Sequence, residues 1–279
     1  MRIAISGTNS SIGRAVVREF SSQGIEIVYL NRTGQGEIFN LAMPIELKLG
    51  HIDAFVHLAW DWEKTYLGSY RRNVENILPL LDSLKSNKTK LVLLSTESAS
   101  GSPGSNYGKV KLKLEQEFSK RGGSSIRAGL LWGSEMSGIV ATICKLSTLS
   151  FVCPHLKPDP AFFVSNEEEI ARELLTQALS VSTSPIVVSL KSRNQIKLSD
   201  ISHAFQGSKL KVLHLDLGVK NIIAIGDLLM TLRIPLPFRV DSLRSLLVMK
   251  DPSQESASVE KCTVSSTQDF LKWVSKFRR

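Results

Sequence analysis

Short runs of apolar residues alternate along the chain with longer stretches in which apolar positions recur at helical spacing. The apolar runs predict strands near residues 2–6, 25–30, 37–41, 52–57, 89–95, 124–131 and 185–190. The helical spacing predicts helices near residues 11–22, 67–85, 106–120 and 167–180. Because strands and helices alternate, we expect an α/β fold with a doubly wound parallel sheet and right-handed crossovers.

One crossover departs from this regular pattern. Only about ten residues separate Leu41 from the strand that begins near Asp53. A parallel crossover normally needs a dozen or more residues, usually including a helix. We therefore expect this connection to be trimmed, with room for a single helical turn.

Small residues, Gly7-Thr-Asn-Ser-Ser-Ile-Gly13, join the first strand to the first helix. Strand, glycine-rich turn and helix in this order are typical of a dinucleotide-binding unit. Gly7 allows a tight turn and Gly13 close packing, with the helix N-terminus facing the phosphates. Ser10 stands where a middle glycine is frequent; it can still bond a phosphate but narrows the approach. The alternative is an ordinary turn between a strand and a helix.

Tyr107 and Lys111 are candidate proton-transfer residues, because positions i and i+4 share one face of a helix. A free tyrosine has a pKa of about 10, and a nearby cation favours the phenolate and lowers that pKa. The alternative is a packed tyrosine beside a solvated lysine. The preceding glycine-rich turn favours the catalytic interpretation.

Composition fits a globular protein with a sizeable core. The chain has 279 residues, 42% of them hydrophobic, which suits one large domain or one and a half. No apolar stretch reaches membrane-spanning length without a charge, and a strand starting at residue 2 leaves no room for a signal peptide. The cysteines lack metal-ligand spacing, so we expect no metal site and unpaired thiols in a cytoplasmic protein: Cys144, Cys153 and Cys262.

The formal net charge of +9 is spread over several segments. A solvated surface is the simplest interpretation. Anionic small ligands such as a dinucleotide or a nucleotide-sugar come second, and nucleic acid is the least favoured partner.

Five further segments resemble, in order, motifs of the extended short-chain dehydrogenases/reductases, the NAD(P)-dependent nucleotide-sugar epimerases and dehydratases. They are residues 52–59 with a His-x-Ala ending, 70–77, 90–96, 127–133 and 162–171. The resemblance covers roughly the first two thirds of the chain; Ala128 replaces the usual proline. It implies a Rossmann-like fold with a small C-terminal substrate-binding lobe.

The resemblance also implies a division of the chain. Residues 1–133 would form the dinucleotide-binding core, joined by roughly 161–204. Residues 134–160 and 205–279 would form a substrate-capping lobe, whose C-terminal part contains a Pro235-Leu-Pro-Phe238 break. A homodimer is possible, through the helices bearing Asn73 and Tyr107.

By the same resemblance, Tyr107 would be the general acid/base and Lys111 would hold the nicotinamide ribose. Thr96 would orient the carbonyl, with Ser95 as runner-up. The implied cofactor-binding residues are Gly7, Asn9, Ser10, Ile12, Gly13, Asn31, Arg32, Asn40, Leu41, Leu58, Ala59, Asn73, Tyr107, Lys111, Ala128 and Leu130.

The end of the second strand bears on the choice of cofactor. An acidic residue there would bind the ribose hydroxyls of NAD(H), but this chain has Asn31-Arg32. A guanidinium suits a 2′-phosphate, so NADP(H) is preferred over NAD(H), unless Arg32 simply caps a surface turn.

The expected reaction is hydride transfer to or from a sugar carbon, with an anionic nucleotide-sugar as substrate. Dehydration is disfavoured, because consecutive acids are expected after Thr96 but Glu97 is followed by Ser98. A ketoreductase is our first expectation and a 4-epimerase the second. A non-catalytic dinucleotide sensor or scaffold is the alternative from another class, supported by the short loop between Thr96 and Tyr107.

Overall fold

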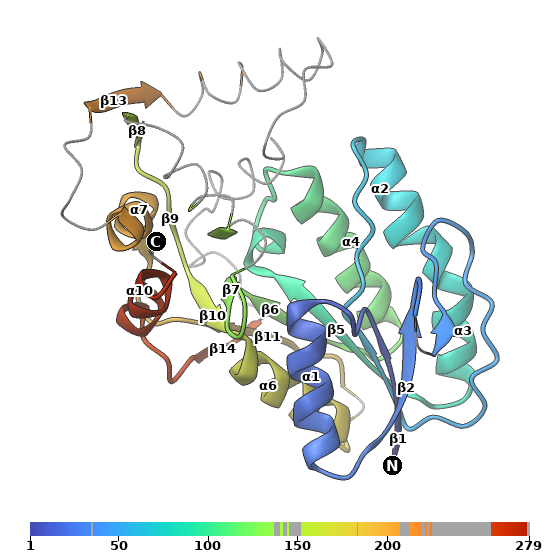
Figure 1. Ribbon diagram of the computed structural model, residues 1–279. Helices are drawn as coiled ribbons and strands as arrows, with labels where there is room; N and C mark the ends of the chain where they lie inside the picture. The colour runs from blue at the N-terminus through green and yellow to red at the C-terminus, as the bar shows by residue number, and fades with distance from the viewer. Residues whose placement is uncertain are drawn as a thin grey trace.

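An eight-stranded, fully parallel sheet organises the chain (Figure 1). The computed structural model describes residues 1–34, 36–136, 140–141, 144, 152–182, 184–206, 213–218, 221, 224 and 258–277. The strand order is β3-β2-β1-β4-β5-β6-β11-β14. Their bounds are β1 Arg2–Ser6, β2 Glu26–Asn31, β3 Glu37–Ile38, β4 Ala54–His57, β5 Lys90–Thr96, β6 Ser124–Ala128, β11 Val187–Lys191 and β14 Ser258–Cys262. The predicted doubly wound α/β fold is confirmed.

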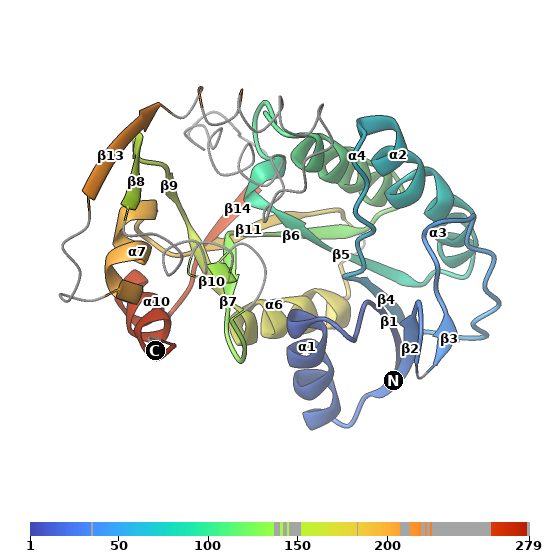
Figure 2. The same ribbon diagram turned by 45° about the horizontal axis from the view of Figure 1, so that its top comes forward.

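Helices cover both faces of this sheet (Figure 2). Helices α1 (Ser11–Ser22) and α6 (Glu167–Leu179) pack on one face, and α3 (Leu78–Ser86) and α4 (Asn106–Lys120) on the other, with α2 (Tyr66–Asn73) against α4. Central strand β1 is buried on both sides: Ile3 and Ile5 belong to one apolar core, whereas Ala4 belongs to the other. Two-sided burial explains why such strands are continuously apolar.

The helix predicted over 67–85 is two helices. Between α2 and α3 lies a 3-10 turn, η1 (Glu75–Ile77). Pro79 is in the first turn of α3, where a missing N–H costs nothing. Further inside a helix its ring would clash with the carbonyl of residue 75, so the long helix is interrupted there.

The strand predicted over 124–131 is also divided. Strand β6 ends at Ala128, and β7 (Leu130–Trp132) pairs instead with β10 (Val164–Asn166). Between them Gly129 passes so close to the backbone of Phe163 that an added Cβ would lie 2.5 Å from its carbonyl oxygen. The chain therefore changes sheets at the only residue type that fits.

The trimmed crossover is confirmed: residues 39–53 contain a turn and no helix. The strand before this crossover is shorter than the predicted 37–41: β3 ends at Ile38. Asn76 fixes this connection by two hydrogen bonds. Its side-chain amide donates to the Leu41 carbonyl, and its backbone carbonyl accepts from Ile45 N.

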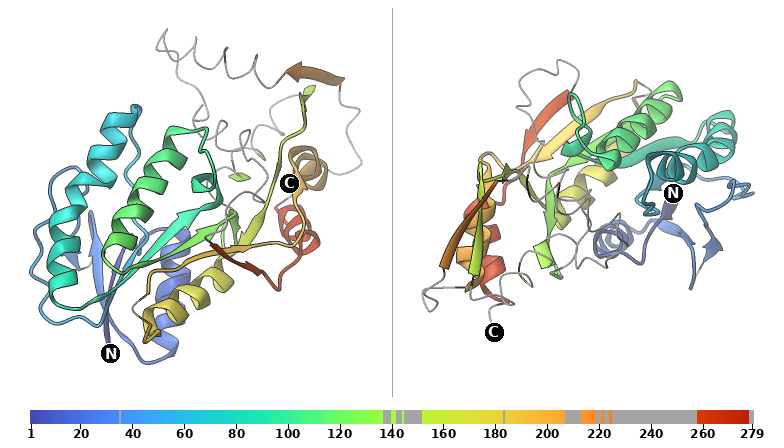
Figure 3. Two further views of the ribbon diagram at one scale, coloured as in Figure 1. Left: turned by 180° about the vertical axis from the view of Figure 1, so that it is seen from behind. Right: turned by 90° about the horizontal axis from the view of Figure 1, so that it is seen from above.

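A third apolar core lies beside the β11 and β14 side of the sheet (Figure 3). It brings together α7 (Leu198–Gln206), α10 (Thr267–Ser275) and the short strands β9 (Ala161–Phe162) and β12 (Ile196–Lys197). Nearby, β8 (Val152–Lys157) pairs with β13 (Leu213–Gly218). Much of the expected capping lobe, including the Pro235–Phe238 break, lies outside the described residues.

Two boundaries differ from the expected division. Strand β14, expected in the lobe, is an edge strand of the main sheet, because it pairs in parallel with β11. Helix α7, expected with the core, packs against α10. Sequence order alone does not reveal that the chain returns to the sheet. Among the described residues, every helix is too short or too polar to span a bilayer.

A buried histidine makes the stability of this fold pH-dependent. His57 ends β4, bonds Ser6 Oγ through Nδ1 at 2.7 Å, and stacks on Phe118. Desolvation, and secondarily the Lys111 cation, lowers the pKa of His57 to about 3. The native state keeps His57 neutral, whereas the unfolded chain takes up a proton below pH 6.5.

We therefore predict that the free energy of unfolding falls as pH drops below 6.5, by up to about 1.4 kcal/mol per unit from this group. His57→Phe, which matches the surrounding rings, should lose this dependence between about pH 6 and 5, above most carboxylate titration. Urea denaturation across that range measures the slopes. Equal slopes in both proteins would contradict the assignment.

Candidate active site

A cavity of about 810 Å³ opens at the carboxyl ends of β1, β2, β4 and β5. This is the edge of a parallel sheet where ligands bind in doubly wound folds. Most of the sequence-predicted site residues line it: Gly7, Asn9, Ser10, Ile12, Asn31, Arg32, Asn40, Leu41, Leu58, Ala59, Ser95, Thr96, Tyr107, Lys111 and Ala128. The structure thus brings together residues at the ends of β1, β2, β4, β5 and β6, from α1 and α4, and from the connection after β3.

Glycines make the turn after β1 compact. Gly7 has a φ of +79°, and a Cβ there would lie 2.8 Å from Ala59 N. At Gly13 an added Cβ would lie 2.3 Å from the Gly7 carbonyl oxygen. Both positions exclude a side chain, so the N-terminus of α1 stays open toward the cavity. Such an N-terminus suits the phosphates of a dinucleotide.

Ser10 has a local task in this turn. Its hydroxyl donates to the Gly7 carbonyl at 2.8 Å and accepts from Gly13 N at 3.0 Å, which makes it the N-cap of α1. The Ser10 hydroxyl proton is thus bonded within the turn. The sequence had instead suggested that Ser10 bonds a phosphate directly.

The lining of the cavity near the end of β2 includes a basic side chain, and acidic side chains are scarce in the lining as a whole. Arg32 is exposed beside the cavity, and Asn31 is fixed by two hydrogen bonds with Thr8. Asp61 is the one acid among the described lining residues, and Arg72 pairs with it at 2.7 Å. The site therefore offers a net positive surface to a bound anion.

Tyr107 lies in the first turn of α4 and lines the cavity. Ser105 caps this helix, accepting from Gly108 N, and an added Cβ at Gly108 would lie 2.1 Å from the Ser98 carbonyl oxygen. The close approach sets α4 directly against η2 (Glu97–Ala99), the turn that follows Thr96. As a result the Tyr107 phenol hydrogen-bonds with Thr96.

The expected lowering of the Tyr107 pKa is wrong for this structure. Burial raises the pKa of Tyr107 to about 12, and the hydrogen bond with Thr96 opposes this only in part. Lys111 does not face the phenol as a bare charge: its ammonium donates to the Leu94 carbonyl at 2.9 Å and lies 4.7 Å over the Trp60 ring. The Tyr107 phenol therefore keeps its proton near neutral pH.

The Lys111 ammonium is itself perturbed. Desolvation lowers its pKa to about 8, partly offset by the charge of Glu115. A buried lysine with a pKa of about 8 thus lies one helical turn from Tyr107, and such perturbed groups are concentrated at functional sites.

Ser95 and Thr96 differ in their surroundings. Thr96 Oγ1 accepts from Ser98 N at 3.2 Å in addition to its contact with Tyr107. Ser95 Oγ, by contrast, is buried with no partner in the described part of the chain. A buried hydroxyl without a partner calls for an explanation, and a ligand oxygen would supply one.

Three predicted cofactor residues do not line the cavity. Gly13 packs beneath the turn, and Leu131 takes the place expected for Leu130. Asn73 is fully buried and bonds both the N–H and the carbonyl of Asp61. It fixes the segment after β4 instead of facing the cavity.

Sequence reasoning also missed part of the wall. The additional lining residues are Leu30, Thr33, Phe39, Trp60, Asp61, Trp62, Leu94, Gly129 and Leu131. A signal existed for the tryptophans, because they directly follow the His-x-Ala ending of β4, which already pointed to the cavity.

With this geometry established, comparison with known proteins identifies the fold. No protein-family model matches the chain, and no curated protein matches its sequence. Among solved structures, MoeE5 in complex with UDP-glucose and NAD has a TM-score of 0.65 at 15% identity, over 78% of this chain and 85% of that chain. TunA, an NAD-dependent NDP-hexosamine 5,6-dehydratase involved in tunicamycin biosynthesis, has a TM-score of 0.64 at 19% identity, over 78% and 85%.

The UDP-N-acetylglucosamine 4-epimerase from Bacillus cereus has a TM-score of 0.60 at 17% identity, over 78% of this chain and 85% of that chain. The chain thus has the Rossmann-like fold of the NAD-dependent nucleotide-sugar epimerases and dehydratases. At these identities the likeness establishes the fold, and it confirms at that level the resemblance inferred from the sequence.

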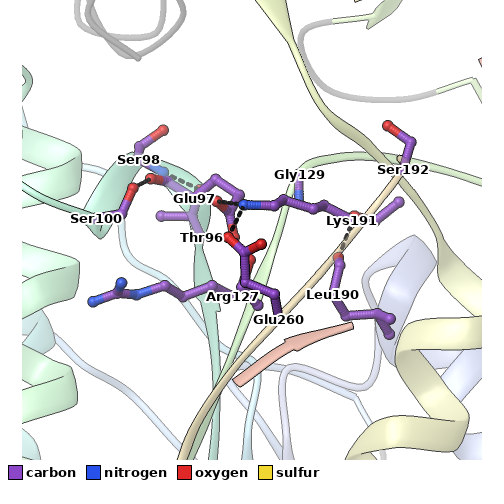
Figure 4. Close-up of polar contacts among 12 residues, drawn as sticks. Thr96, Glu97, Ser98, Ser100, Arg127, Gly129, Leu190, Lys191, Ser192 and Glu260 are labelled. Carbon is purple, nitrogen blue, oxygen red and sulfur yellow. Dashed lines mark hydrogen bonds and ion pairs between the residues drawn. The ribbon is translucent and has the colours of Figure 1, made fainter. Parts of the chain in front are cut away.

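A buried ion cluster supports the turn that follows Thr96 (Figure 4). Glu97 accepts from Ser189 Oγ at 2.5 Å, and the Lys191 ammonium lies 3.4 Å from its second oxygen. Lys191 also pairs with Glu260 on β14 at 3.0 Å and lies over the Phe163 ring. Glu97 is thereby tied to β11 and does not line the cavity.

We predict that Lys191→Met lowers the free energy of unfolding by about 3 kcal/mol, because it leaves the buried Glu97 carboxylate without a cation. Glu97→Gln should cost less, since Lys191 keeps Glu260. As a control, Lys261→Met breaks the pair between Lys261 on β14, whose side chain is 42% exposed, and Glu173 on α6. Because water reaches this cation, we expect a cost under about 1 kcal/mol. Urea denaturation gives the three values, and equal losses would show that burial does not set the cost.

Proposed function

We propose that this protein is an NAD(P)-dependent oxidoreductase of the epimerase/dehydratase type that transfers hydride to or from a sugar carbon. The observation that carries the proposal is the meeting of the Gly7 turn with Thr96, Tyr107 and Lys111 around one cavity. A scaffold that only binds a dinucleotide does not need a proton donor at the inner wall. The fold likeness supports the same class, since MoeE5 was solved with UDP-glucose and NAD.

Each residue has a separate part in the proposed reaction. The turn at Gly7 and the N-terminus of α1 hold the diphosphate, and Lys111 holds the ribose next to the nicotinamide. The cofactor, when bound, supplies or accepts the hydride. Tyr107 gives its proton to the substrate carbonyl oxygen, while Ser95 or Thr96 orients that oxygen. A phenol held neutral by burial suits the donor direction, which is reduction.

Among the sub-reactions, we favour a ketoreductase acting on a nucleotide-sugar. Dehydration requires an acid and a base in the cavity, but Glu97 bonds Ser189 and Lys191 outside it. A 4-epimerase with bound NAD is the second candidate, supported by the fold likeness to a UDP-N-acetylglucosamine 4-epimerase. The α7–α10 region and the remaining C-terminal residues would cap the substrate.

NADP(H) is the preferred cofactor in this proposal. Arg32 follows β2 directly and is exposed beside the cavity, where the 2′-phosphate of the adenosine ribose would lie. No acid at this point of the described wall repels that phosphate, since Asp61 lies in the segment after β4 and is paired with Arg72.

Tyr107→Phe should reduce turnover by about a hundredfold or more while NADPH affinity changes less than about twofold, because only the proton donor is lost. NADPH oxidation with nucleotide-linked keto-sugars measures the rate, and fluorescence titration measures affinity. Tyr70→Phe removes a hydroxyl outside the cavity and serves as control. Undiminished turnover in Tyr107→Phe would refute the proposed mechanism.

Arg32→Ala should weaken NADPH binding by about tenfold or more, since a charge-assisted hydrogen bond contributes roughly 1.5–3 kcal/mol. NADH binding should hardly change. Arg18→Ala, an exposed site on α1 outside the cavity, controls for loss of general positive charge. Parallel titrations of the three proteins with both dinucleotides test this. If wild type binds NADH more tightly, the epimerase with resident NAD becomes the better proposal.

A further inference from the structure

Trp60 contacts both proposed catalytic side chains, Tyr107 and Lys111. Its ring meets the Tyr107 ring edge-on, with centroids 4.9 Å apart and an interplanar angle of 82°. The Lys111 ammonium lies 4.7 Å from the centroid of the Trp60 ring. All three side chains line the same cavity.

The indole N–H of Trp60 is unsatisfied. In the described part of the chain, five buried side-chain polar atoms lack a hydrogen-bond partner, and only Trp60 Nε1 and Ser95 Oγ belong to residues that line the cavity. A buried donor without a partner costs free energy, so each such group calls for an explanation. An acceptor supplied by a ligand would satisfy both atoms.

The segment that carries Trp60 is held rigidly. Asn73 bonds the N–H and the carbonyl of Asp61 at 2.8 and 2.7 Å. Arg72 pairs with the side chains of Asp61 and Glu63 at 2.7 and 2.9 Å. Donors fixed before the ligand arrives bind it without an ordering cost.

Trp62 closes one side of the same region. Its ring stacks on Tyr107 with centroids 5.3 Å apart and meets Trp60 edge-on, while 47% of its surface stays exposed. The Trp60 indole thus packs against Trp62 as well as against Tyr107.

The chemistry of this corner selects an acceptor-rich group. An indole N–H and an ammonium can only donate, and a phenol with a pKa of about 12 keeps a proton that it can donate at neutral pH, although its oxygen can also accept. Carbonyl and hydroxyl oxygens on a sugar ring offer the lone pairs that these groups need.

We infer that Trp60 is a substrate-binding residue whose Nε1–H donates a hydrogen bond to an oxygen of the sugar ring on which Tyr107 acts. The inference rests on the proposed function and adds to it a residue that discriminates between sugars by the oxygen they present. Sites built to bond a substrate hydroxyl reject analogues that lack it more strongly than apolar pockets reject a missing methylene.

The test compares wild type with Trp60→Phe, which keeps a ring beside Lys111 and Tyr107 but removes the N–H. The probes are UDP-glucose, UDP-galactose and their deoxy analogues, titrated calorimetrically into the NADPH-loaded protein. We expect Trp60→Phe to weaken binding of at least one parent sugar about tenfold, with NADPH affinity within about twofold. Tyr70→Phe, a conservative ring change outside the cavity, should alter sugar binding less than about threefold.

The deoxy analogues separate a direct contact from a structural effect. The analogue that lacks the bonded oxygen should bind wild type and Trp60→Phe equally, because the partner of the N–H is already absent. Loss of an unsatisfied buried N–H should also leave Tm nearly unchanged. A purely structural role would weaken every analogue alike.

Two results would overturn the inference while the proposed function stands: unchanged sugar affinity in Trp60→Phe, or a matching loss of NADPH affinity that assigns the donor to the dinucleotide. If no nucleotide-sugar binds, the inference is wrong because it names that class. Failure of the proposed function has a different signature, namely no dinucleotide binding or turnover that survives Tyr107→Phe.

Discussion

The parallel pairing of β1, β4 and β5 is the constraint on which the site depends. Ser6 lies opposite His57, and β5 continues beyond His57 to Thr96. Because parallel strands end at the same edge, the turn at Gly7, the segment after Ala59 and the hydroxyls of Ser95 and Thr96 converge there. Two close backbone approaches, at Gly7 and Gly108, then bring the helix N-termini against that edge.

Burial controls the chemistry more than local charge does. The Tyr107–Lys111 spacing suggests a cation that acidifies a phenol, yet burial raises the pKa of the phenol and lowers that of the ammonium. Both groups are brought closer to their neutral forms, and the Leu94 carbonyl and the Trp60 ring engage the lysine. The resulting wall is rich in donors, which in the proposed reaction would stabilise an oxygen that gains negative charge.

Polar pairs hold the loops that the sheet leaves unsupported. Asn73 and Arg72 fix the segment with Trp60, while Asn76 fixes the short crossover. On the far side of Thr96, Glu97 reaches across to β11. These contacts join residues remote in sequence, so a local motif search does not reveal them. They explain why Asn73, expected at the cofactor, lies beneath the wall of the cavity.

Apolar runs, helical spacing and the glycine-rich turn sufficed to predict the doubly wound sheet and the trimmed crossover, because these features depend on local pattern and on strand order. Most lining residues were predicted from the resemblance of ordered motifs to a known family. Pro79 and Gly129 mark breaks that periodicity alone did not show. Only the tertiary structure decided that β14 returns to the sheet, that Trp60 and Trp62 enclose Tyr107, and how the pKa values shift. Those outcomes depend on desolvation and on contacts between distant segments, and neither is encoded in the spacing of residues along the chain.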